Sequence, residues 1–137
     1  MPSSGLLTAE DLLRVGIRNK RVELVKGVLI VSEPAGGRHG RVAMTLTLRL
    51  GAHVERTRAG QLYAAETGFT LERHPDTVRA PDIAFVRAER LPRPEPAGYP
   101  DLAPDLVVEV LSPTDRTGEV LAKVADWLSA GTPLVWV

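Results

Sequence analysis

The sequence predicts an α/β fold, and two observations near its end indicate this class. Residues 105–111, DLVVEVL, are apolar on both faces, which is typical of a central strand covered by helices. Residues 117–131, TGEVLAKVADWLSAG, then have a helical pattern, and residues 133–137, PLVWV, begin another strand. A strand, a helix and a strand in this order form a right-handed crossover unit with parallel strands.

The N-terminal part is predicted to form a short helix followed by a hairpin. Thr8 caps the helix, Asp11 follows three residues later as in a capping box, and Gly16 ends the helix. The run RVELVKGVLIVSE, residues 21–33, has two β-rich segments around Lys26-Gly27. This two-residue connection predicts a tight hairpin, because glycine accepts a positive φ. The PAGG sequence that follows is predicted as a loop.

The longest helix is predicted from Arg38 to Ala59, with Gly60 as its stop. Apolar residues recur every four positions and define one stripe of this helix: Val42, Leu46, Leu50 and Val54. Arginines are left for its other faces: Arg41, Arg49, Arg56 and Arg58. We therefore expect an amphipathic helix that covers the sheet with its apolar stripe.

Two strands of one sheet are predicted between the long helix and a proline-rich segment. Residues 61–72, QLYAAETGFTLE, are predicted as one long strand that can bulge at Gly68. Residues 73–79 are predicted as a turn, and residues 81–86, PDIAFV, as a second strand of the same sheet. Residues 87–104 contain five prolines and are predicted as an irregular loop.

The C-terminal helix is predicted to be capped at Thr117 and to stop at Gly131. Its predicted buried stripe consists of Val120, Leu121, Val124, Trp127 and Leu128. The length of 137 residues suits one domain over residues 1–137. Because the chain stops inside the strand PLVWV, we expect this domain to lack its C-terminal end, the alternative being an edge strand that ends there.

Composition excludes several classes of protein. The chain is 44% hydrophobic and 25% charged and has no cysteine, so it is a globular protein without disulfides, thiolate zinc sites or a cysteine nucleophile. No apolar run approaches the roughly 20 residues of a membrane span, and a cytoplasmic location is expected by default. The net charge is zero, unlike that of a general nucleic-acid binder. Basic residues nevertheless outnumber acidic ones in the first half, and the second half shows the reverse.

Glu109 is the first candidate site residue, because an ionised carboxylate in an apolar strand must be paired, neutralised or bound to a metal. Asp82 opens the apolar run PDIAFV, and if the two strands pair, both acids converge at one end of the sheet. Converging carboxylates repel each other unless a cation or a proton lies between them. With oxygen ligands and no cysteine, the expected cation is Mg²⁺ or Mn²⁺.

Lys123 is the third candidate. At 100° per residue it lies at −60° from Val120, beside the apolar stripe of its helix, and can lean over the sheet toward Glu109. Two acids, a metal and an ammonium group are suited to phosphodiester hydrolysis, because the metal activates water and the ammonium group orients it.

Three segments resemble the Uma-type putative restriction endonuclease family, a branch of the PD-(D/E)XK nuclease superfamily. They are VELVKGVLIVSEP, RAPDIAFV and PDLVVEVLSPTDRTGEVLAKVADWLSAGTPLVWV, and they occur in the family's order from about Leu13 to the end of the chain. The resemblance implies a restriction-endonuclease-like core, with a central mixed β-sheet flanked by helices and a magnesium site on its central strands.

The resemblance also implies roles for individual residues. Asp82 matches the first acid of the superfamily motif and Glu109 the second. The motif's lysine belongs two residues later, where this chain has Leu111, and Lys123 matches branches whose lysine has moved to the next helix. Glu23 matches an N-terminal acid that completes the site. A histidine common near the start of the long helix corresponds to His39, without an assigned role.

Each of these residues also has an ordinary structural interpretation. Glu109 and Lys123 can be a buried structural pair, Asp82 a turn residue before a strand, and Glu23 a solvent-facing strand residue. The function expected from the whole pattern is a Mg²⁺- or Mn²⁺-dependent endonuclease acting on DNA, with Asp82 and Glu109 as metal ligands and Glu23 and Lys123 assisting. The resemblance further implies a homodimer.

Two other functions remain open at this point. One is a catalytically inactive nuclease-fold scaffold that binds DNA or protein, which the leucine at position 111 and the zero net charge favour. The other is a two-carboxylate glycosidase, which the low aromatic content disfavours because sugar sites use aromatic platforms.

Overall fold

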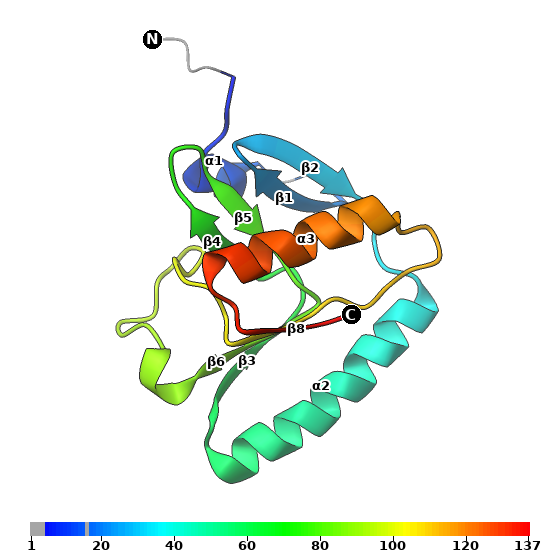
Figure 1. Ribbon diagram of the computed structural model, residues 1–137, viewed down its shortest axis with the longest axis vertical. Helices are drawn as coiled ribbons and strands as arrows, with labels where there is room; N and C mark the ends of the chain where they lie inside the picture. Colours follow the sequence, from blue (N-terminus) through cyan, green and yellow to red (C-terminus); the bar gives the residue numbers. More distant parts are fainter. Residues whose placement is uncertain (1–4, 16) are drawn as a thin grey trace.

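The computed structural model describes residues 5–15 and 17–137, so Gly16 as the predicted end of the first helix lies outside the described residues. The described chain forms two four-stranded sheets and three α-helices (Figure 1). The elements are α1 (Ala9–Arg14), β1 (Arg21–Val25), β2 (Val28–Ser32), α2 (Gly37–Thr57), β3 (Gly60–Tyr63), β4 (Phe69–Glu72), β5 (Thr77–Arg79), β6 (Ile83–Arg87), β7 (Leu106–Val108), α3 (Thr117–Ala130) and β8 (Leu134–Trp136), with a short 3-10 helix, η1 (Ala88–Arg90).

The mixed sheet has the strand order β3-β6-β7-β8. Its pairs β3–β6 and β6–β7 are antiparallel, whereas β7 and β8 are parallel and joined through α3. This confirms the predicted strand–helix–strand unit and the central position of β7. In Figure 1, α3 crosses above this sheet and α2 extends along its other side. The fold is therefore α/β, with a mixed sheet flanked by helices.

The second sheet is antiparallel, has the order β2-β1-β5-β4, and carries α1. The predicted capping box is present, since Thr8 Oγ1 accepts from the N–H of Asp11 and Asp11 Oδ2 accepts from the N–H of Thr8. The predicted hairpin is present as well. Lys26 (φ 50°) and Gly27 (φ 79°) both adopt left-handed conformations, which match the twist of the flanking strands.

Residues 61–72 do not form one strand, so this prediction was wrong. The segment divides into β3 and β4, which belong to different sheets. Glu66 has φ 72°, and the N–H of Thr67 donates to the carbonyl of Ala64, so a turn interrupts the extended chain. The expected turn at residues 73–79 is likewise shorter than predicted, because Thr77–Arg79 is the buried strand β5.

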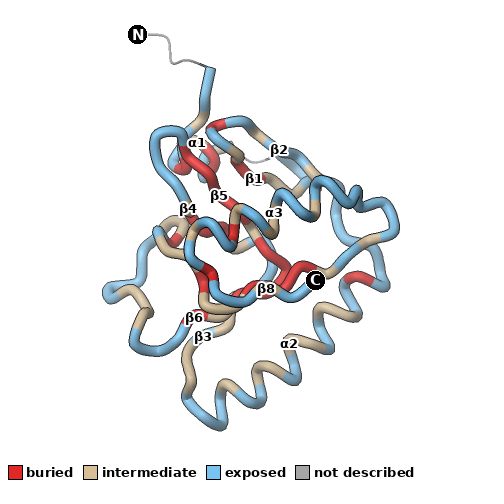
Figure 2. The backbone as a smooth tube through the Cα atoms, viewed as in Figure 1, coloured by how far each residue is buried: buried red, intermediate tan, exposed pale blue. Residues whose placement is uncertain are grey.

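The predicted long helix is present, but it ends two residues earlier than predicted. α2 ends at Thr57, and Arg58 (φ 52°) takes the left-handed capping position. Gly60 instead begins β3, where a Cβ atom would lie 2.0 Å from the carbonyl oxygen of Val86, so the close approach of β3 to β6 requires glycine. Within α2, all of which the structure describes, only His39 is buried. The rest of the helix is drawn as intermediate or exposed in Figure 2.

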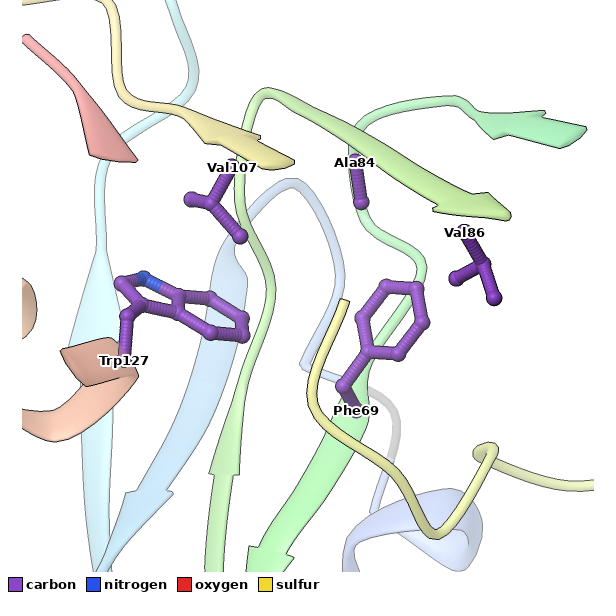
Figure 3. Packing of buried hydrophobic residues seen from close by; sticks show 5 residues of the cluster. All are labelled: Phe69, Ala84, Val86, Val107 and Trp127. Atoms are coloured by element: carbon purple, nitrogen blue, oxygen red, sulfur yellow. The ribbon is translucent and has the colours of Figure 1, made fainter. Parts of the chain in front are cut away.

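The main apolar core lies between the mixed sheet, β4 and α3. It consists of Phe69, Ala84, Val86, Val107 and Trp127, all at most 1% exposed. In Figure 3 the Trp127 ring lies beside Val107 and the Phe69 ring lies beneath Ala84 and Val86. The Phe69 and Trp127 rings meet edge to face with centroids 6.4 Å apart.

The buried stripe of α3 is narrower than the sequence predicted. Trp127 is fully buried, but Leu121 and Leu128 are 61% and 51% exposed. At 100° per residue these two leucines lie at 100° and 80° from Val120, on the far side from Trp127. The buried face is therefore centred nearer to Lys123 than the apolar pattern alone indicates.

Among the described residues, no helix combines the length and the apolar character that a membrane span requires.

Candidate active site at the end of the mixed sheet

The register of β6 and β7 brings the two predicted acids together. Ile83 lies opposite Val108 in this antiparallel pair, so Asp82 and Glu109 follow as the next opposing positions. Because side chains alternate along a strand, Asp82 is on the face of Ala84, and Glu109 is on the face of Val107. Ala84 and Val107 both belong to the core, so the two acids lie at the end of the apolar layer.

Asp82 is 5% exposed, and the described residues engage both of its carboxyl oxygens. Oδ2 accepts from the backbone N–H of Val110 at 2.7 Å and lies 3.2 Å from Nε2 of His39. Oδ1 pairs with the guanidinium of Arg21 at 3.3 Å. The backbone bond ties Asp82 to the chain just beyond Glu109 and fixes the relative position of the two acids.

Glu109 is 6% exposed, and its Oε1 is buried without a hydrogen-bond partner among the described residues. Its Oε2 lies 3.8 Å from Nζ of Lys123. Burial raises the pKa of Glu109 to about 8. The positive charge of Lys123 opposes this rise in pKa, while the negative charges of Glu23 and Asp82 add to it. Glu109 therefore holds a proton at neutral pH unless a cation replaces it.

Glu23 and Lys123 reach the same place from other elements. Glu23, on β1, accepts from the N–H of Ala80 at 2.9 Å and lies 3.5 Å from Arg79. Nζ of Lys123, on α3, is 4.0 Å from Glu23 and 3.8 Å from Glu109. Lys123 thus links the two sheets, and all four predicted site residues (Glu23, Asp82, Glu109 and Lys123) lie in one cluster.

The ion pairs in this cluster give Glu109 no cation of its own. Three cations, Arg21, Arg79 and Lys123, match three carboxylates, Glu23, Asp82 and Asp126, through the contacts between them. Glu109 is a fourth acid and shares Lys123 with Glu23. The raised pKa of Glu109 agrees with this balance, because a further negative charge here has no cation of its own.

Two further residues complete the site. Arg21 was not predicted as a site residue. It precedes Glu23 by two positions and therefore lies on the same face of β1, and this spacing could have indicated it from the sequence. His39 was noted without a role, and its Nε2 contacts Asp82, while its Nδ1 is buried without a partner among the described residues. Its contact places the first turn of α2 beside the acids.

A small cavity lies between these side chains. Its volume is about 30 Å³, which suits one ion or a water molecule, and Arg21, His39, Asp82, Glu109, Ser112 and Lys123 are among its lining residues. A groove of about 710 Å³ adjoins it, between the start of α2 and the turn after β7, and also borders His39. The cavity therefore has an open surface beside it.

The donor set fits a divalent cation in part. Two carboxylates and an unpartnered buried oxygen are the chemistry that Mg²⁺ and Mn²⁺ require. However, both oxygens of Asp82 are already engaged, and residues 5–15 and 17–137 contain no group of three or more His, Asp or Glu side chains arranged to hold a metal ion. A metal would bind Glu109 directly, and Asp82 only after a partner of Asp82 withdraws.

Comparison with known proteins finds a family for the chain. The model of the Uma2 family, described as "Putative restriction endonuclease", matches residues 9–137. A crystal structure described as a putative nuclease belonging to DUF820 from Anabaena variabilis ATCC 29413 has the same fold, with a TM-score of 0.81. The two chains are 23% identical, and the alignment covers 95% of this chain and 72% of that one. No curated protein matches the chain.

Proposed function

We propose, from the premise that this chain belongs to the Uma2 family described as "Putative restriction endonuclease", that it hydrolyses DNA phosphodiester bonds with Mg²⁺ or Mn²⁺. The family and the nuclease-like fold support the general class. The substrate, the metal and the residues that act are the proposal. The homodimer and the single-domain organisation implied at the sequence level stay predictions.

One observation carries the proposal, namely the buried, unpartnered oxygen of Glu109 beside Asp82. An acid that the surrounding cations do not neutralise is unfavourable in a folded protein unless something binds it. A divalent ion would displace the proton of Glu109 and would bind in the small cavity that both acids line. A buried acid with a raised pKa that lines a cavity is a common feature of functional sites.

The roles follow from the contacts of each residue. Asp82 and Glu109 would hold the ion, which when bound lowers the pKa of water and polarises a phosphate. Lys123 lies within 4.0 Å of both Glu109 and Glu23, and its ammonium group would orient the attacking water. Glu23 would position Lys123, because its other contacts, to Ala80 and Arg79, fix its carboxylate.

The adjoining groove would admit the DNA strand. It runs past Arg38 and the backbone of Gly36 and Gly37 to Ser112 and Thr114, so a cation, N–H groups and hydroxyls line it. These groups are the usual partners of phosphate oxygens and carry no sequence information by themselves. This predicts affinity for the DNA backbone that weakens as the salt concentration rises.

The proposal predicts that Mn²⁺ raises the melting temperature of the wild type by about 5 °C or more and supports cleavage of plasmid DNA. Both effects should be lost in Asp82→Ala and in Glu109→Ala. Thermal denaturation with and without Mn²⁺, followed by gel assays of plasmid and single-stranded DNA, measures this. Glu119→Ala, at an exposed position of α3, is the matched control and should behave as the wild type.

The engagement of both Asp82 oxygens favours a second candidate, the inactive scaffold. In that case Arg21, His39 and the N–H of Val110 are the permanent partners of Asp82, and the cluster only holds the two sheets together. The scaffold predicts no effect of Mn²⁺ on the melting temperature and no cleavage with any divalent ion. That result would replace the nuclease proposal.

A further inference from the structure

We propose that Arg21 is a phosphate-binding residue that exchanges partners: it neutralises Asp82 in the metal-free protein and moves to a phosphate of the substrate when the metal binds. This inference rests on the proposed function, since it assigns a role within the same site. It concerns a residue that the sequence pattern did not indicate.

The position of Arg21 supports an exchange. Its guanidinium lies 3.3 Å from Oδ1 of Asp82, the carboxyl oxygen that neither His39 nor Val110 contacts. The side chain of Asp82 is 4% exposed, whereas that of Arg21 is 22% exposed. Arg21 therefore covers Asp82 from the solvent side, where both a metal ion and a phosphate group must arrive.

The charges around Asp82 favour such a movement. Arg21 already balances the charge of Asp82, so an added divalent ion would place two cations against the same carboxylate. A guanidinium and a divalent ion that both lie against Asp82 repel each other at short range. The arriving phosphate supplies negative charge, and a guanidinium binds phosphate through two parallel hydrogen bonds.

The other two cations are less free to move. Arg79 contacts Glu23 on one side and Asp126 at 2.9 Å on the other, and its side chain is 6% exposed. Lys123 lies between Glu23 and Glu109. Arg21 has Asp82 as its ion-pair partner, and both residues line the same two cavities. Arg21 therefore has a single ion pair to break and has space beside it.

The test compares metal binding without DNA and cleavage with DNA in the same variants. Arg21→Gln should bind Mn²⁺ about tenfold more tightly than the wild type, because the competing cation is gone, as measured by calorimetry. The same variant should cleave plasmid DNA about 100-fold more slowly at saturating Mn²⁺, because the phosphate has lost its partner. A purely structural ion pair would not produce these opposite signs.

Two variants serve as controls. Arg18→Gln removes the same charge from an exposed position three residues earlier and should change neither quantity. Arg21→Lys keeps the charge but not the paired N–H groups, so its Mn²⁺ affinity should stay within about twofold of the wild type while cleavage falls about tenfold. The lysine variant also tests the proposal if the glutamine variant does not fold.

An unchanged or weaker Mn²⁺ affinity in Arg21→Gln would overturn the exchange. Tighter Mn²⁺ binding together with a wild-type cleavage rate would overturn the phosphate-binding role. In both cases the wild type still binds metal and cleaves DNA, so this inference fails while the proposed function stands. If the wild type neither binds Mn²⁺ nor cleaves DNA, the proposed function has failed and this inference falls with it.

Discussion

Asp76 and Glu109 are buried to nearly the same degree, with 3% and 6% of their surfaces exposed, yet their surroundings are opposite. Asp76 lies just before β5 in the antiparallel sheet. Its Oδ2 accepts from the N–H of Ala9 and from Arg73, and its Oδ1 accepts from the N–H of His74. Burial alone would raise the pKa of Asp76, but these donors outweigh burial and hold the pKa below its usual value.

Glu109 has no backbone donor to its side chain among the described residues, and one of its oxygens has no partner. Its pKa is raised to about 8 by burial, with further contributions from the negative charges of Glu23 and Asp82. Burial of an acid is therefore a poor indicator of function by itself. The number of donors around the acid distinguishes a residue that holds the fold together from one that is available to a ligand.

Replacing Asp76 should destabilise the protein strongly at pH 7. Asp76→Asn puts an amide beside Arg73 and the N–H groups of Ala9 and His74, so the free energy of unfolding should fall by about 2 kcal/mol at pH 7. Because the pKa of Asp76 is lowered in the folded state, its stabilising effect is present above the unfolded value of 3.8 and is lost as the pH falls through the folded pKa. Urea denaturation at pH 7 and pH 3 measures both.

Asp101→Asn is the matched control, because Asp101 also contacts Arg73 but its side chain is 61% exposed. Its effect should be below about 0.5 kcal/mol. Asp76→Asn should leave Mn²⁺ binding unchanged wherever the variant is folded. A loss of metal binding in Asp76→Asn would mean that the two regions are not separate in function.

Replacing Glu109 should change the stability with the opposite sign. The folded state raises the pKa of Glu109 from 4.5 to about 8, so the stability of the metal-free wild type is highest below pH 4.5 with respect to this group and declines as the pH rises through 8. Glu109→Gln resembles the protonated form at every pH. It should therefore match the wild type near pH 4 and exceed its free energy of unfolding by several kcal/mol near pH 8.5, because each pKa unit corresponds to about 1.4 kcal/mol.

Urea denaturation in the presence of a chelator, at both pH values, measures this difference. Glu55→Gln, on the exposed face of α2, is the control and should show no pH-dependent gain. If Glu109→Gln were less stable than the wild type at pH 8.5, the carboxylate of Glu109 would be a structural partner like that of Asp76.

The sequence predicted the elements whose signals are local. The capping box at Thr8, the turn at Lys26-Gly27 and the strand–helix–strand unit around β7 all depend on neighbouring residues, and the structure confirms them. The convergence of Asp82 and Glu109 was also predictable, because it needed only that two apolar strands pair. The roles of these acids in catalysis stay predictions.

Other features depended on contacts between distant segments. Nothing within residues 61–72 shows that β3 and β4 belong to different sheets, because both halves have strand-forming residues. The partners of Arg21 and Asp76 could not be predicted either, although the position of Arg21 on the face of Glu23 could. Arg21 meets Asp82 across 61 positions, and Asp76 meets Ala9 across 67. The first pair comes from the packing of the two sheets and the second from the packing of α1 on its sheet, and neither follows from a local pattern.

Lys123 allows the smallest change that tests the difference between Asp76 and Glu109. It is the nearest cation to Glu109, whereas Asp76 is held largely by backbone donors. Lys123→Met removes the positive charge 3.8 Å from Glu109, so the pKa of Glu109 should rise beyond about 8, by roughly half a unit given that Lys123 is partly exposed. Carboxyl ¹³C chemical shifts followed from pH 5 to pH 10 measure this change.

Lys26→Met is the control, because it breaks an exposed contact with Glu72 and should leave the pKa of Glu109 unchanged. An unchanged pKa in Lys123→Met would mean that the charge of Lys123 does not affect the protonation of Glu109. Lys123 would then lose the electrostatic link to Glu109 that the proposed mechanism requires.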